Sequence, residues 1–259
     1  MSARFETRRT RLVEYAPWIL RDYFTNQGPS TALVVLLVGV LTITSELSII
    51  SMMGGPGGPV KLGDIPLDVA RRALHTITPT LTFLGALFAT NGIVANDRKL
   101  GYYRFLFAKP VSPPVYYAST FALYGAGLIG ISFLLLLVWG LAVRPMFPPE
   151  FFAIVAVFYV AYGGIGFLLS AAWRFDWLSL VTVLFVANVL WSLWEHATGL
   201  RHWVLYLLPP VHRAGDVYAL LLHGQRGTSW MAIAWLGGYG LICFVLGMIV
   251  IRRRSLGTS

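Results

Sequence analysis

The chain has 259 residues, of which 57% are hydrophobic and only 12% are charged, and its mean hydropathy is +0.69. Soluble domains average about a quarter charged residues, so the composition excludes an ordinary soluble protein. A net charge of +9 would favour nucleic-acid binding in a soluble protein. Here the basic residues lie at the ends of apolar segments, where a membrane surface explains them. We therefore expect one all-α transmembrane domain over residues 1–259 that contacts lipid and no nucleic acid.

The first segment, residues 1–28, alternates arginines with aromatic and aliphatic residues at helical spacing. This pattern predicts an amphipathic helix in the cytoplasmic interface of the membrane, with a possible kink at Pro17. A plain basic tail that obeys the positive-inside rule is the alternative. The Asn-Gln-Gly-Pro sequence at residues 26–29 predicts a turn before the first span.

The first two spans are expected at residues 31–53 and 74–95, with a short external helix at residues 65–74 between them. Glu46 lies inside the first span, where a carboxylate is costly. It either lines a pathway or reaches the outer interface, and the sequence favours neither. Asn91 in the second span is a second pathway candidate, although a hydrogen bond between helices is the simpler interpretation.

Four further apolar segments complete a predicted set of six spans, each long enough to cross the hydrocarbon layer. Residues 195–229 between the last two are too long for a simple connection. Within them, residues 203–208 are apolar but too short to span, and prolines follow. We expect this piece to re-enter the outer leaflet and to place Trp203 and Tyr206 at the exit of a pathway. The four spans are expected at residues 117–143, 151–172, 178–194 and 230–251.

The distribution of Lys and Arg predicts the orientation. Thirteen of the twenty fall in the segments that this topology places inside, and seven fall in those that it places outside. Cytoplasmic loops carry the excess of basic residues, so both termini are expected in the cytoplasm.

The most informative segment connects the second and third spans, at residues 96–114. It is basic and aromatic, and prolines end it. Leu100, Tyr103 and Phe107 recur at spacings of three and four, which predicts one apolar stripe on a short helix. Asp97 and Lys109 stand near the ends where an acid and a base suit the helix dipole. An ordinary basic loop is the alternative interpretation.

This segment resembles the coupling-helix loop of type-2 ABC transporter permeases. The family's loop has a charged cluster, a glycine, an apolar-aromatic run and then Pro-Val-Ser. This chain has Tyr102 and Pro113 where the family usually has Thr and Arg. The resemblance implies that ten residues contact an ATPase: Asp97, Arg98, Lys99, Gly101, Tyr103, Arg104, Phe105, Phe107, Lys109 and Pro110.

The resemblance further implies the permease subunit of an ATP-driven transporter, with export favoured over import. Two copies would enclose the pathway. ATP and Mg²⁺ would bind to separate ATPase subunits, and this chain itself would hold no cofactor and no metal. The expected location is the inner membrane of a prokaryote.

Catalytic motifs do not point to an enzyme. The sequence contains no phosphate-binding G-x-x-x-x-G-K-[ST], no G-x-S-x-G and no H-E-x-x-H. Its single cysteine, Cys243, excludes a cysteine metal cluster. A membrane enzyme or metal-handling protein remains a rival, as does a passive scaffold for a soluble partner. The residues that would serve the first rival are Glu195, His196, His202, His212 and Asp216.

Aromatic residues of the last two spans allow two interpretations. Packing or an interfacial belt is the simpler one. Contact with an amphipathic substrate is the other, and it would involve Trp191, Trp194, Trp235 and Tyr239.

Overall fold

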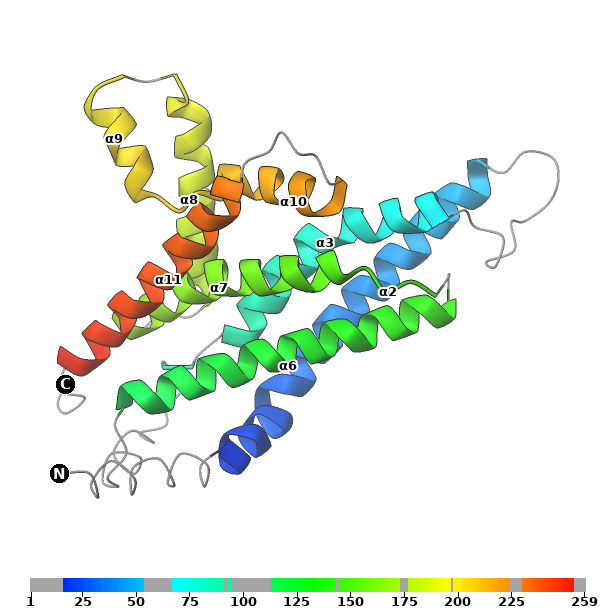
Figure 1. Ribbon diagram of the computed structural model, residues 1–259, viewed down its shortest axis with the longest axis horizontal. Helices are drawn as coiled ribbons and strands as arrows, with labels where there is room; N and C mark the ends of the chain where they lie inside the picture. Colours follow the sequence, from blue (N-terminus) through cyan, green and yellow to red (C-terminus); the bar gives the residue numbers. More distant parts are fainter. Residues whose placement is uncertain are drawn as a thin grey trace.

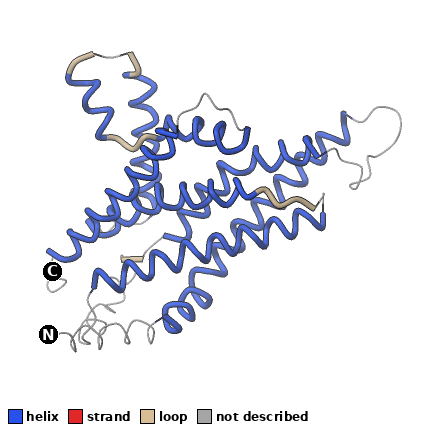
Figure 2. The backbone as a smooth tube through the Cα atoms, in the orientation of Figure 1, coloured by secondary structure: helices blue, strands red, loops and turns tan. Residues whose placement is uncertain are grey.

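The structure is a computed structural model of the whole chain. It describes residues 16–53, 67–90, 93–94, 113–142, 145–172, 177–196, 198–223 and 230–253. Within these ranges the regular structure is helical and no strand occurs, which confirms the all-α class (Figure 2). The long helices are α2 (Gly28–Met53), α3 (Leu67–Thr90), α6 (Pro113–Ala142), α7 (Pro149–Ala172), α8 (Trp177–Trp194) and α11 (Trp230–Arg253).

Three of these helices are long and apolar enough to cross a membrane by length and composition. They are α6, α7 and α11. A fourth span results if residues 16–25 and 28–42, which meet at a bend of 48°, count as one. Residues 76–90 of α3 and 178–194 of α8 are shorter apolar helices. The described chain is therefore compatible with a multi-pass membrane protein.

The predicted turn at residues 26–29 is wrong. Residues 16–22 are helical, and the chain continues through a π-helical segment, η1 (Tyr23–Gln27), into α2. Pro29 has no amide hydrogen, so the ordinary hydrogen bond to the carbonyl of Thr25 is absent there. The amide of Gly28 instead donates to the carbonyl of Tyr23, and the chain bends by 48° without leaving helical geometry.

The separate external helix expected at residues 65–74 is also wrong. α3 runs without a break from Leu67 to Thr90, through Arg71 and beyond Pro79. Its early part is held by packing, because Ala70, Leu74 and Ile77 recur at spacings of four and three and are each at most 2% exposed. Burial of these three side chains keeps α3 helical across the charged residues at which the sequence suggested a helix boundary.

The centre of the bundle is α7, which packs most extensively on α11 and then on α3, with α6, α8 and α10 (Ala214–His223) around it. The backbones of α7 and α11 lie very close together where the two helices cross, because a glycine of each helix faces the backbone of the other. A Cβ built on Gly164 would lie 2.0 Å from the carbonyl oxygen of Gly240. A Cβ on Gly240 would lie 2.2 Å from the carbonyl oxygen of Val160. Small residues at such crossings let two helix backbones approach in a membrane.

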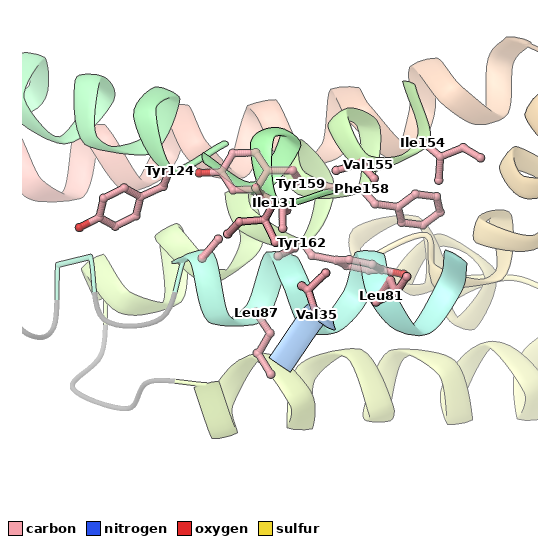
Figure 3. Close-up of a cluster of buried hydrophobic side chains, with 14 of the residues drawn as sticks. Val35, Leu81, Leu87, Tyr124, Ile131, Ile154, Val155, Phe158, Tyr159 and Tyr162 are labelled. Atoms are coloured by element: carbon pink, nitrogen blue, oxygen red, sulfur yellow. The ribbon is translucent and has the colours of Figure 1, made fainter. Parts of the chain in front are cut away.

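Aromatic side chains extend this core between α6, α7 and α11. The ring of Phe121 on α6 lies 4.8 Å from that of Tyr159 and 4.5 Å from that of Phe244, centroid to centroid. The Tyr159 hydroxyl donates to the backbone carbonyl of Phe121 at 2.6 Å. Figure 3 shows Tyr159 and Tyr162 of α7 within the buried cluster, together with Leu81 of α3.

Successive long helices alternate in direction (Figure 1). Near the lower left of the figure lie the end of α3, the beginning of α6, the end of α7 and the end of α11. The end of α2, the beginning of α3 and the end of α6 lie at the opposite, upper right side. The connection between α3 and α6 therefore joins two helix ends on the side where α11 ends with Arg252 and Arg253.

Between α8 and α11 the described residues form three short elements. They are α9 (Leu200–Leu207), the 3₁₀ turn η3 (Val211–Arg213) and α10 (Ala214–His223). α9 ends immediately before the extended Leu208 and the two prolines that follow. The entry of this segment into the outer leaflet stays a prediction.

Candidate functional site

The ten predicted coupling residues, from Asp97 to Pro110, lie outside the described residues. The structure does describe the two anchors of that segment. Ile93 and Val94, after the end of α3, are 5% and 0% exposed. On the other side α6 begins at Pro113, four residues before the expected start of its span. Proline suits the first turn of a helix because its missing amide hydrogen has no partner there in any case.

Of the four pathway candidates, two can be placed by their side chains. Asn91 lies outside the described residues, and Glu46 belongs to α2 without a described side chain. Trp203 and Tyr206 both lie on α9, where they are 72% and 45% exposed. Their rings lie 6.3 Å apart.

Tyr206 is the centre of a group of rings that joins α8, α9 and α11, which we call the outer aromatic cluster. Its ring lies 6.5 Å from that of Trp191 on α8 and 6.0 Å from that of Trp235 on α11, and both pairs meet edge to face. His202 on α9 also meets it edge to face, at 5.2 Å. The members of the outer aromatic cluster are Trp191, His202, Trp203, Tyr206, His212 and Trp235.

α9 is held onto the bundle by one face. Leu205 is 1% exposed, and the Tyr239 hydroxyl of α11 donates to the backbone carbonyl of Leu207 at 2.8 Å. The opposite face presents Leu200, Trp203 and Leu207, which are 81%, 72% and 77% exposed. Such an amphipathic element with tryptophan suits the boundary between headgroups and acyl chains.

His212 of η3 is held by contacts with two neighbouring side chains. Its ring lies 3.6 Å from that of Trp191, and its Nε2 accepts a hydrogen bond from Nε of Arg213 at 3.1 Å. Burial and the neighbouring Arg213 lower the pKa of His212, while Asp216 and Glu195 oppose the shift. Both the hydrogen bond and the lowered pKa favour neutral imidazole.

The residues proposed for a metal site do not converge. Arg213 donates to His212 and also to Asp216, with its Nη1 3.4 Å from Oδ2 of the carboxylate. Within the described ranges no three His, Cys, Asp or Glu side chains come together as a metal ion would require. A structural zinc site needs about four such ligands.

Sequence reasoning missed the contact that joins α10 to the bundle. The Tyr218 hydroxyl lies 2.6 Å from that of Thr82 on α3, and the Tyr218 ring stacks on Phe158 of α7 with centroids 4.5 Å apart. The two hydroxyls are 136 positions apart in the chain, and no local pattern signals such a pairing. A second contact between α3 and α7 is the ion pair of Arg71 with Glu150, which lies in the first turn of α7.

Comparisons with protein-family models, with curated proteins and with solved structures found no match to this chain. Its function must therefore be argued from the residues and their arrangement.

Proposed function

We propose that this chain is the transmembrane subunit of a type-2 ABC transporter. The complete transporter would contain two copies of this chain together with separate ATPase subunits. ATP and Mg²⁺ would bind to the ATPases, and this chain would supply the pathway. All six long helices would cross the membrane, with both termini in the cytoplasm of a prokaryotic cell. Export is the favoured direction.

One observation carries the proposal. A basic, aromatic sequence with the pattern of a coupling helix connects α3 and α6, whose adjoining ends lie on the side where α11 ends in Arg252 and Arg253 (Figure 1). Basic residues mark the cytoplasmic side of membrane proteins. The segment would therefore face the compartment in which ATP is available.

The packing supplies a route from that segment into the bundle. α3 and α6 both pack on α7, and α3 also packs on α2. Tyr117 of α6 and Thr90 at the end of α3 are 0% and 3% exposed, so both anchors are held firmly. A displacement of the segment by a closing ATPase dimer would move α3 and α6 as rigid elements, which is how packed helices transmit a switch.

The outer aromatic cluster would form the other end of the pathway. Two kinds of contact hold this end together: aromatic rings meet edge to face, and the Tyr239 hydroxyl of α11 donates a hydrogen bond to a backbone carbonyl of α9. Trp203 and Tyr206 are exposed there and would meet an amphipathic substrate as it leaves. Lipid, glycan, peptide and drug substrates are all compatible with this proposal.

The proposal is tested by charge reversal in the segment. The tagged chain is purified from its native membranes, and the eluate is assayed for vanadate-sensitive ATP hydrolysis and for a protein that photo-labels with azido-ATP. Arg104→Glu reverses one charge, and Gly101→Pro breaks the predicted helix. Each should reduce the co-purified ATPase activity at least tenfold without loss of the chain from the membrane.

Arg21→Glu is the matched control, because Arg21 is exposed in the helical segment before η1. It should retain the activity. Wild-type eluate without any nucleotide-binding protein would contradict the proposal. A partner that co-purifies without ATP hydrolysis or any response to nucleotide would favour the scaffold, and stoichiometric metal with hydrolytic activity in the purified chain would favour the enzyme.

A further inference from the structure

The outward face of α8 carries an amide among apolar side chains. α8 packs inward through Leu180, Leu184 and Ala187, which are at most 6% exposed. Its outward residues include Phe185 at 66% and Leu193 at 70%. Between them, however, Asn188 and Ser192 are also exposed.

Asn188 belongs to a regular stripe. Val181, Phe185, Asn188 and Ser192 follow one another at spacings of four, three and four, which is the pattern of a helix–helix seam. Their side chains are half-buried at Val181 and exposed at the other three positions. The amide of Asn188 makes no hydrogen bond to the part of the chain that the structure describes.

The exposed middle parts of α6 and α11 carry only apolar side chains, as a surface in contact with lipid requires. The exposed side chains in the middle of α6 are apolar, among them Phe133, Leu134 and Leu137. The same holds for α11, with Leu241 and Ile242 exposed by 56% and 62%. Transfer of an amide from water to hydrocarbon is strongly unfavourable unless the amide forms a hydrogen bond there. The Asn188 stripe is therefore unsuited to lipid.

We propose that this stripe packs against the same stripe of a second copy, so that the two α8 helices run side by side across a two-fold axis and the two Asn188 amides hydrogen-bond to each other. The inference rests on the proposed function only in its assumption of two copies. An amide offers both a donor and an acceptor, so it is complementary to its own symmetry mate. One Asn within an apolar seam also fixes the register of a parallel helix pair.

The apolar residues of the stripe complete the interface. Phe185 lies about one turn before Asn188 and is 66% exposed within a single copy. A second copy would cover this ring, and close packing of the two helices would supply the dispersion contacts that drive association in a membrane. Ser192 is small, which allows the backbones to approach one turn further along.

Cysteine cross-linking in native membranes tests the geometry. In a Cys243→Ala background, Asn188→Cys should form a disulfide-linked dimer on mild oxidation, because facing positions of a parallel pair lie within disulfide range. Leu193→Cys is the matched control on the same helix. It lies five residues on, about 140° around the helix axis, and should not cross-link. Phe133→Cys on α6 is a second control with the same expectation.

Association supplies an independent readout. Asn188→Leu should raise the dimer dissociation constant in detergent about 3- to 30-fold, and Asn188→Gln should restore most of the affinity. Cross-linking through Leu193 or Phe133 in place of Asn188 would overturn the inference. Free labelling of Asn188→Cys by aqueous thiol reagent without cross-linking would also overturn it, and would assign the stripe to a water-filled pathway.

The proposed α8 interface can fail its test while the proposed transporter function passes. A complex that contains two copies by mass, yet gives no cross-link at Asn188, would refute this interface and leave the transporter proposal intact. A chain that is monomeric in the membrane and in complex would refute the interface and the two-copy transporter together. Loss of ATPase coupling in the variants at Arg104 and Gly101 bears on the transporter alone.

Discussion

The crossing of α7 and α11 and the outer aromatic cluster are held together in different ways. At the crossing, backbone meets backbone at Gly164 and Gly240, and no side chain could be added without moving a helix. In the outer aromatic cluster, rings meet at centroid distances of about 5 Å or more in most pairs, and Trp203 remains largely exposed. The difference indicates a rigid centre and an outer segment that can move without disturbing it.

The largest effect is expected at the crossing. Gly240→Ala places a Cβ 2.2 Å from the carbonyl of Val160, so the helices must separate. We expect a loss of roughly 2–3 kcal/mol in the free energy of unfolding, measured in detergent or bicelles. Gly237→Ala on the same helix is the control, since nothing lies within 4 Å of its Cβ. Equal effects at the two positions would show that the crossing is not the rigid centre.

A smaller effect is expected where α10 joins the bundle. Tyr218→Phe keeps the ring stacked on Phe158 but loses the hydrogen bond to Thr82. The free energy of unfolding should fall by about 1 kcal/mol. Thr82→Val should cost a similar amount, and the double variant should cost little more than either single one. Strict additivity of the two would contradict a direct interaction.

Removal of the bond that ties α9 to α11 should act only locally. Tyr239→Phe loses the donor to the Leu207 carbonyl, and about 0.6 kcal/mol is a typical value for such a bond in a membrane protein. Hydrogen exchange in α9 should speed up severalfold while the amides of α7 keep their protection. A uniform increase over both helices would mean that the outer segment does not open independently.

The smallest expected effect is a pH dependence in the outer aromatic cluster. The lowered pKa of His212 means that the fold favours its neutral form. The unfolded value is near 6.5, so this contribution is complete above about pH 6.5 and is lost as the pH falls through the lower, folded pKa. Amide exchange is itself base-catalysed and slows as the pH falls, so the comparison uses protection factors corrected for the intrinsic rate. These should be lower at residues 211–213 at pH 5 than at pH 7.5. His212→Gln should abolish that difference, and a difference that persists would place its origin in another group.

The predicted and the observed helix bounds agree best where hydropathy alone determines the position of a helix. The long apolar segments became helices whose ends fall near the expected residues, as at α7 and α8, because burial of a continuous apolar run needs no partner information. Local signals failed at Pro29 and at Arg71, where a π-helical segment and a buried stripe kept the helix continuous. Tyr218 could not be predicted, since its partners come from distant helices. The coupling residues stay a prediction.

The central claim is that the segment between α3 and α6 contacts a separate ATPase. A photo-cross-linking amino acid at Phe105, with the same substitution at the exposed Leu141 of α6 as control, tests it in intact membranes. The account predicts one cross-linked partner at Phe105, an ATP-binding protein whose yield changes when ATP and vanadate are added, and no such partner at Leu141. Equal cross-linking to an ATP-binding protein at both positions, or none at Phe105 under any nucleotide condition, would contradict it.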